Sequence, residues 1–163
     1  MNIQVGIIMG SKSDWEVMSN VSATLDKLGI SSENRVISAH RAPGLLTDYC
    51  ETARDRGIKI LVCGAGLAAA LPGVAAAHTS LPVLGVPMES RALGGMDALL
   101  SIVQMPPGVP VGTLGIGKAG AKNAALLAAA ILALSDAKVS EALEAFRAAQ
   151  TKSIADMPPP DAD

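Results

Sequence analysis

The sequence predicts a doubly wound α/β domain, in which helices cover both faces of a parallel sheet. Five short apolar runs recur along the 163 residues, and each is followed by a loop of small residues and then by a helical pattern. Short, continuously apolar strands are typical of parallel sheets that are buried on both faces. The regular alternation of strand and helix is the pattern of such layered folds.

Glycine and proline mark several of the predicted element boundaries. Strands are predicted in order at residues 3–9, 34–38, 58–65, 81–87 and 111–117. Helices are predicted at residues 13–28 and 43–56, up to Ala77, around residues 96–104, and at residues 121–134 and 138–153. Gly29 and Gly57 close the first two helices, and Pro43 is a common first helical residue.

Length and composition indicate one globular domain without a nucleic-acid partner. We expect a single domain over residues 1–155, followed by a loose tail at residues 156–163 that contains three consecutive prolines. Hydrophobic residues make up 50% of the chain, and the net charge is -2 without a basic run, which excludes nucleic-acid binding. Cys50 and Cys63 form no C-x-x-C pair, so we interpret both as reduced core thiols.

The N-terminal stretch MNIQVGIIMG reads as a strand and lacks the features of a signal peptide, which predicts a cytoplasmic protein. The most apolar run, AALLAAAILAL at residues 124–134, is shorter than the roughly 20 residues of a membrane-spanning helix. This run is apolar on every side, and such a helix must be buried all round, often by other subunits. We therefore expect a homo-oligomer that does not associate with membranes.

Polar residues gather in the loops that follow the predicted strands, where ligands bind in open α/β sheets. In GSKSD, Ser11, Ser13 and Asp14 stand at a helix start, where free backbone N–H groups favour a phosphate. A simple N-cap explains the same residues equally well. Arg41, after the next strand, presents a guanidinium that suits a phosphate, although alone it reads as a surface arginine.

His40 is the best proton carrier in these loops, because an imidazole titrates near neutrality and serves as acid or base. His78 is interpreted as structural. The two histidines show no metal-ligand spacing, and no serine lies in a G-x-S-x-G elbow. GAGLAA lacks the acidic residue of a dinucleotide site, and GTLGIGKA lacks the hydroxyl residue of a P-loop.

Several motifs together resemble the PurE family, the 5-(carboxyamino)imidazole ribonucleotide mutases of purine biosynthesis. They cover nearly the whole chain: GSKSDW, SAHR, GAG-AA-LPG, LPVLGVP, SIVQMP-G-PVGTL-IGKAGA-NAALLAA-IL and RAAQT. The arginine after the histidine resembles the bacterial mutase branch. The branch that carboxylates aminoimidazole ribonucleotide directly with CO2 usually carries a lysine there.

The resemblance implies a flavodoxin-like three-layer α/β/α sandwich with a parallel sheet and an extra C-terminal helix, assembled as an octamer that exchanges helices between subunits. It implies His40 as the general acid/base, without a metal or other cofactor. Ser11, Ser13, Asp14 and Arg41 would hold the ribose and phosphate. A further set would surround the base and its carboxylate, namely Ser38 and the backbone of Ala65, Gly66 and Leu71.

The chain departs from the family pattern G-A-G-G-A-A-H-L-P-G at two positions, where Leu67 replaces a glycine and Ala70 replaces a histidine. The glycine matters where a backbone angle or a close ligand approach requires it. Retained mutase activity is the favoured expectation. Direct carboxylation with CO2 and an impaired, ligand-binding oligomeric scaffold are the alternatives.

Overall fold

The computed structural model describes residues 3–161, and its centre is a five-stranded parallel sheet. The strands are β1 (Val5–Met9), β2 (Ser32–Val36), β3 (Ile60–Ala65), β4 (Val83–Pro87) and β5 (Gly112–Thr113). Their order is β2-β1-β3-β4-β5, which is the flavodoxin-like order. The predicted flavodoxin-like α/β sandwich is confirmed.

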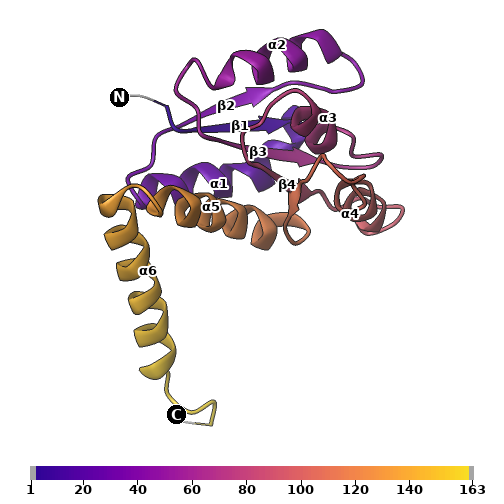
Figure 1. Ribbon diagram of the computed structural model, residues 1–163. Coiled ribbons are helices and arrows are strands. Elements are labelled where there is room, and N and C mark those ends of the chain that lie inside the picture. The colour runs from indigo at the N-terminus through magenta and orange to yellow at the C-terminus, as the bar shows by residue number, and fades with distance from the viewer. Residues whose placement is uncertain (1–2, 162–163) are drawn as a thin grey trace.

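Helices cover both faces of the sheet and divide the core into two halves (Figure 1). They are α1 (Trp15–Lys27), α2 (Pro43–Ala53), α3 (Leu71–Ala77), α4 (Met96–Val103), α5 (Gly117–Ala133) and α6 (Ala137–Ala155), preceded by the 3-10 turn η1 (Lys12–Asp14). Buried residues of α1 and α5 pack on one face, and those of α2, α3 and α4 pack on the other. The three central strands are buried at every position, as their apolar runs predict.

The two edge strands differ from their predicted positions. β2 begins and ends two residues earlier than residues 34–38, and its last three residues are exposed. Ile37 is buried and its N–H donates to the carbonyl of Met9, so extended backbone continues past the strand. β5 has two residues, whereas the predicted strand has seven. The N–H of Leu114 donates to the carbonyl of Gly85, and the sheet pairing ends there.

The start of α5 requires glycine at position 120. This helix begins at Gly117, four residues before its predicted start. A Cβ atom placed on Gly120 would overlap the carbonyl oxygen of Gly115, in the loop that leads into the helix. Lys118 pairs with Glu16 of α1 at 2.8 Å, on the outside of the molecule. Gly120, which directly follows GTLGIGKA, therefore allows the close approach of two backbone segments.

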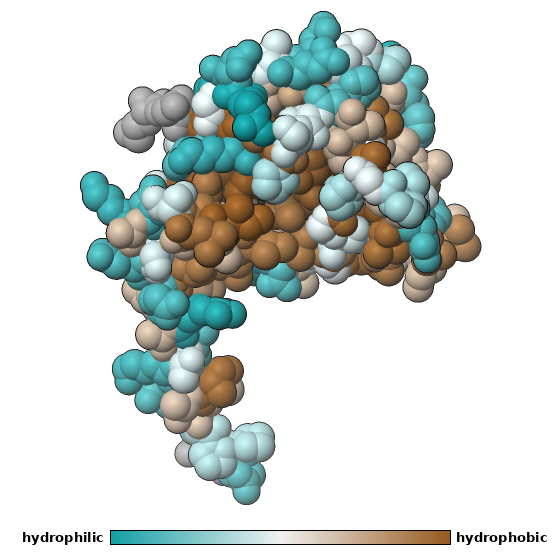
Figure 2. All heavy atoms as spheres, viewed as in Figure 1, coloured by the Kyte–Doolittle hydropathy of each residue, from teal (hydrophilic) through white to brown (hydrophobic). Residues whose placement is uncertain are grey.

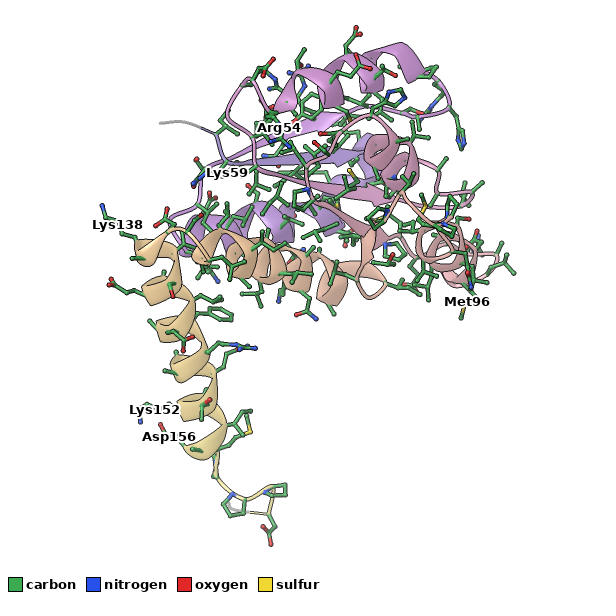
Figure 3. All side chains as sticks on the ribbon, in the orientation of Figure 1. Arg54, Lys59, Met96, Lys138, Lys152 and Asp156 are labelled. Atoms are coloured by element: carbon green, nitrogen blue, oxygen red, sulfur yellow. The ribbon has the colours of Figure 1, made fainter. Side chains whose placement is uncertain are left out.

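The last helix, α6, leaves the body where α5 ends and extends away from it (Figure 1). Asp136 caps it by accepting from the N–H groups of Lys138 and Val139, and Val139 is the one buried residue within this fully described helix. Near its far end, Lys152 pairs with Asp156 at 2.6 Å in solvent (Figure 3). The predicted tail of residues 156–163 lies partly outside the described residues, so its separation from a domain of residues 1–155 stays a prediction.

Both thiols are buried and free, as predicted. Burial raises the pKa of the Cys50 thiol to about 11 and raises the pKa of Cys63 well above its usual value. Such thiols stay protonated at neutral pH and are poor nucleophiles. None of the helices within residues 3–161 is long and apolar enough to cross a membrane.

Replacing Gly120 with alanine tests the close approach at the start of α5. We expect Gly120→Ala to lower the free energy of unfolding by about 3 kcal/mol, because the new methyl group collides with backbone that cannot yield. Gly44→Ala is the matched control, since Gly44 also lies near a helix start and a Cβ there meets no atom within 4 Å. Urea unfolding followed by circular dichroism measures both. Equal stability of the two variants would contradict the proposed role of Gly120.

Candidate active site

A cleft of about 680 Å³ opens at the carboxyl edge of the sheet. The segments that follow β1, β2, β3 and β4 line it, as expected for a ligand site in a doubly wound fold. All nine site residues predicted from the sequence line this cleft: Ser11, Ser13, Asp14, Ser38, His40, Arg41, Ala65, Gly66 and Leu71. The structure thus brings together residues that are up to 60 positions apart in the chain.

The segment after β1 forms a capped turn whose hydroxyls face the cleft. Ser11 Oγ accepts from the N–H of Ser13 at 3.3 Å, and Asp14 Oδ2 accepts from the N–H of Ser11 at 3.0 Å, which together form a capping box. Ser13 Oγ donates to Ser11 Oγ at 2.9 Å. The N-cap interpretation is therefore correct, and it leaves both hydroxyls on the cleft surface, where they can also bond a ligand.

Asp14 is half-buried in this turn. Burial raises the pKa of its carboxyl group, and the hydrogen bond from Ser11, the charge of Arg41 and the hydrogen bond from Gly10 offset part of that rise. A partly desolvated carboxylate gains from additional hydrogen-bond donors. A ligand with hydroxyl groups, such as a sugar diol, would supply such donors.

Arg41 joins the segments that follow β1 and β2. Its Nη2 donates to the carbonyl of Gly10 at 3.0 Å, and its Nε donates to Ser38 Oγ at 3.2 Å. Ser38 Oγ also accepts the backbone N–H of Arg41 at 3.2 Å. These bonds hold the guanidinium beside Ser11 and Asp14, so the positive charge stands where an anion would meet the hydroxyls.

His40 lies between Ser38 and Arg41 on the cleft surface and is exposed. Within residues 3–161, no hydrogen bond occupies either nitrogen of its ring. Its imidazole is therefore free to exchange a proton with a ligand in the cleft.

His78 contrasts with His40, because its ring is engaged between two helices. Its Nε2 lies 3.4 Å from Thr47 Oγ1, and its Nδ1 lies 3.5 Å from Glu51 Oε1. Neither His78 nor its partners line the cleft. These contacts agree with the structural interpretation of His78.

The inner wall of the cleft is apolar. Ala65 ends β3, and the segment after it consists of glycine, leucine and alanine up to Leu71, the first residue of α3. Met88 is buried behind this segment, and a Cβ on Gly66 would stand 3.1 Å from the Met88 Cβ. The cleft therefore has a polar end near Arg41 and an apolar end beside Met88.

The two departures from the family pattern lie on this wall. Leu67 has a φ of 58°, a left-handed conformation that a bulky side chain rarely adopts, so a glycine would suit the position. Its side chain lines the cleft and is 63% exposed. Ala70 caps α3 without a side-chain hydrogen bond and presents only a methyl group.

Nine of the lining residues were not among the predicted site residues, and three of these, Met88, Glu89 and Ser90, follow β4. Their position at a strand end was the available signal, but methionine and glutamate suggest no particular chemistry.

Within the described residues, Ser90 Oγ and Asp97 Oδ1 are buried without a hydrogen-bond partner. Residues 3–161 contain no group of three or more histidine, cysteine, aspartate or glutamate side chains arranged to hold a metal ion.

Comparison with known proteins gives one consistent family. The family model described as AIR carboxylase matches residues 4–153. The N5-carboxyaminoimidazole ribonucleotide mutase of Vibrio cholerae is 58% identical over 156 residues, which cover 96% of this chain and 97% of that protein. The mutase of the same name from Bacillus subtilis is 59% identical over 143 residues, 88% of each chain. The crystal structure of Treponema denticola PurE superposes with a TM-score of 0.84 and 27% identity over 93% of each chain.

Proposed function

This chain belongs to the AIR carboxylase family, and we propose that the cleft around His40 carries out its reaction. The chain is an isomerase of purine biosynthesis. It moves a carboxyl group from the exocyclic nitrogen to the ring carbon of an aminoimidazole ribonucleotide. The relatives of 58% and 59% identity carry the mutase name, so neither direct carboxylation with CO2 nor an inactive scaffold is favoured.

The polar end of the cleft suits the ribose and phosphate. Ser11 and Ser13 offer hydroxyls, and Arg41 offers a guanidinium that its bonds to Gly10 and Ser38 hold in place. Asp14 accepts hydrogen bonds from the ribose hydroxyls. This arrangement leaves the aminoimidazole pointing toward His40 and the apolar wall.

His40 transfers two protons during one turnover. Its imidazolium protonates the exocyclic nitrogen of the carbamate, the N–C bond breaks with its electron pair on nitrogen, and an amine and CO2 result. The electron-rich ring carbon then attacks the carbon of CO2 and forms the new C–C bond. Neutral His40 removes the proton from that ring carbon, which restores the aromatic ring and the imidazolium. The free ring nitrogens of His40 are the single observation that carries this assignment.

The apolar end of the cleft suits the CO2 intermediate. Water there would compete for CO2 and solvate the reacting groups. A wall without polar side chains therefore favours attack of the ring carbon on the released CO2. Ser38 and the backbone of Ala65, Gly66 and Leu71 surround the base and its carboxylate in this proposal. Ala70 adds a methyl group to this apolar surface.

We also propose that the chain works as a cytoplasmic homo-octamer. Exposed apolar side chains lie on α5, at its C-cap and on α4, including Leu127, Leu134, Met96 and Leu100. Figure 2 shows an apolar surface in this part of the molecule, and Figure 3 shows Met96 pointing outward. Contiguous apolar surface of this kind is typical of subunit interfaces. The extended α6 offers a second surface that a neighbouring subunit would cover.

Replacing His40 tests the mechanism. We expect His40→Asn to lower kcat by at least about a thousandfold, because an amide cannot exchange a proton at neutral pH. The assay follows by absorbance the interconversion of the N-carboxylated and ring-carboxylated ribonucleotides, without ATP or added metal. His78→Asn is the matched control and keeps its turnover, since His78 lies outside the cleft. Turnover by His40→Asn near that of the unmodified chain would refute the role of His40.

Sedimentation velocity tests the proposed assembly. We expect one species near eight times the 16.5 kDa chain, because the apolar faces of α4 and α5 need partners. The His40→Asn variant provides the control, as its exposed side chain has no part in packing, and it should sediment identically. A monomer at micromolar concentration would contradict the octamer and leave the exposed leucines unexplained.

A further inference from the structure

Leu67 combines two features that general packing does not explain. It is the one non-glycine residue with positive φ in the part of the chain that the structure describes. It also lines the cleft with an apolar side chain that is 63% exposed. A disfavoured backbone conformation held at a ligand site is commonly related to the function of that site.

The segment around Leu67 is anchored at both ends and at the buried Ala69, and it is held more loosely at Leu67 and Ala68. The carbonyl of Ala65 accepts a hydrogen bond from the N–H of Met88 at 2.9 Å. The carbonyl of Ala70 accepts a hydrogen bond from the N–H of Val74 at 2.9 Å. Between these anchors, one backbone bond is present within the described structure, from the N–H of Ala70 to the carbonyl of Ala68 at 2.8 Å. Few bonds and exposed side chains mark a segment that moves at low cost.

We propose that Leu67 is an apolar gate that keeps CO2 in the cleft between breakage of the N–C bond and formation of the C–C bond. This inference rests on the proposed mutase reaction. CO2 is small and neutral, so no charged group can anchor it, and its retention depends on closing the path to solvent. The neighbouring alanines carry only methyl groups, and Met88 is already buried in the wall. Leu67 is thus the large apolar side chain free to move over the opening.

The gate determines the fate of the intermediate. When CO2 stays, the ring carbon captures it and releases its proton to His40. When CO2 escapes, the ring carbon keeps its proton, and the products are aminoimidazole ribonucleotide and free CO2. The ratio of the decarboxylated to the ring-carboxylated ribonucleotide therefore reports retention, and this ratio is independent of how much active protein is present.

The experiment supplies the full chain with the N-carboxylated ribonucleotide in buffer that contains ¹³C-bicarbonate. Chromatography gives the ratio of the two products, after subtraction of the decarboxylation that occurs in buffer without protein. Mass spectrometry gives the ¹³C content of the ring-carboxylated product. Leu67→Ala and Leu67→Asn remove the apolar cover, and asparagine tolerates a left-handed conformation, which separates loss of the cover from backbone strain. Leu67→Met keeps an apolar side chain. Leu45→Ala is the control, because Leu45 is 49% exposed on α2 outside the cleft.

We expect Leu67→Ala and Leu67→Asn to raise the decarboxylated fraction and the ¹³C content about tenfold, as for the loss of one apolar contact. Leu67→Met and Leu45→Ala should match the unmodified chain. Unchanged ratios in both the alanine and the asparagine variants, with substrate still consumed, would overturn the gate and leave the mutase reaction standing. An unmodified chain that consumes no substrate would overturn the mutase reaction, and the gate with it.

Discussion

Because every strand of the sheet runs parallel, the segments that follow β1, β2, β3 and β4 emerge at one edge, and the order β2-β1-β3-β4-β5 opens a crevice there. Residues that are distant in the chain become neighbours through this geometry alone. Glycine in β3 helps to keep the layers close, since a Cβ on Gly64 would stand 2.5 Å from Met18 Sδ and 2.7 Å from Met88 Cε. Each functional group therefore sits on a scaffold that is packed on both faces.

Hydrogen bonds within the cleft divide its surface into a fixed part and a free part. Asp14 and Ser38 accept hydrogen bonds within their own segments, and Arg41 joins the two segments by donating to Gly10, which favours a pre-formed site for an anionic, hydroxyl-rich group. His40 and Leu67 lack such bonds in the described structure, and these are the residues assigned to proton transfer and to retention of CO2. In the proposed mechanism, binding depends on the hydrogen-bonded residues of the cleft, and the chemistry depends on His40 and Leu67.

Much of this arrangement was predictable from the sequence, because apolar runs and glycine boundaries are local signals. The three central strands and the position of His40 after the second strand follow from such signals. The first and last residues of β2 and β5 do not follow from such signals. The length of an edge strand depends on its pairing with the neighbouring strand, which the local sequence does not identify. The sequence showed Leu67 only as a departure from a family glycine and did not show its left-handed conformation. Ser90 lines the cleft because it follows a strand, and no sequence motif marks it.

The central claim is that one cleft binds the ribonucleotide with its reactive ring beside residue 40. A crystal structure of the His40→Asn variant with the ring-carboxylated ribonucleotide tests it most directly, because this variant should bind the ligand without converting it. The account predicts the phosphate against Ser11, Ser13 and Arg41, and the carboxylate within the segment from Gly66 to Leu71. A ligand bound outside this cleft, or one with its ring turned away from residue 40, would contradict the account.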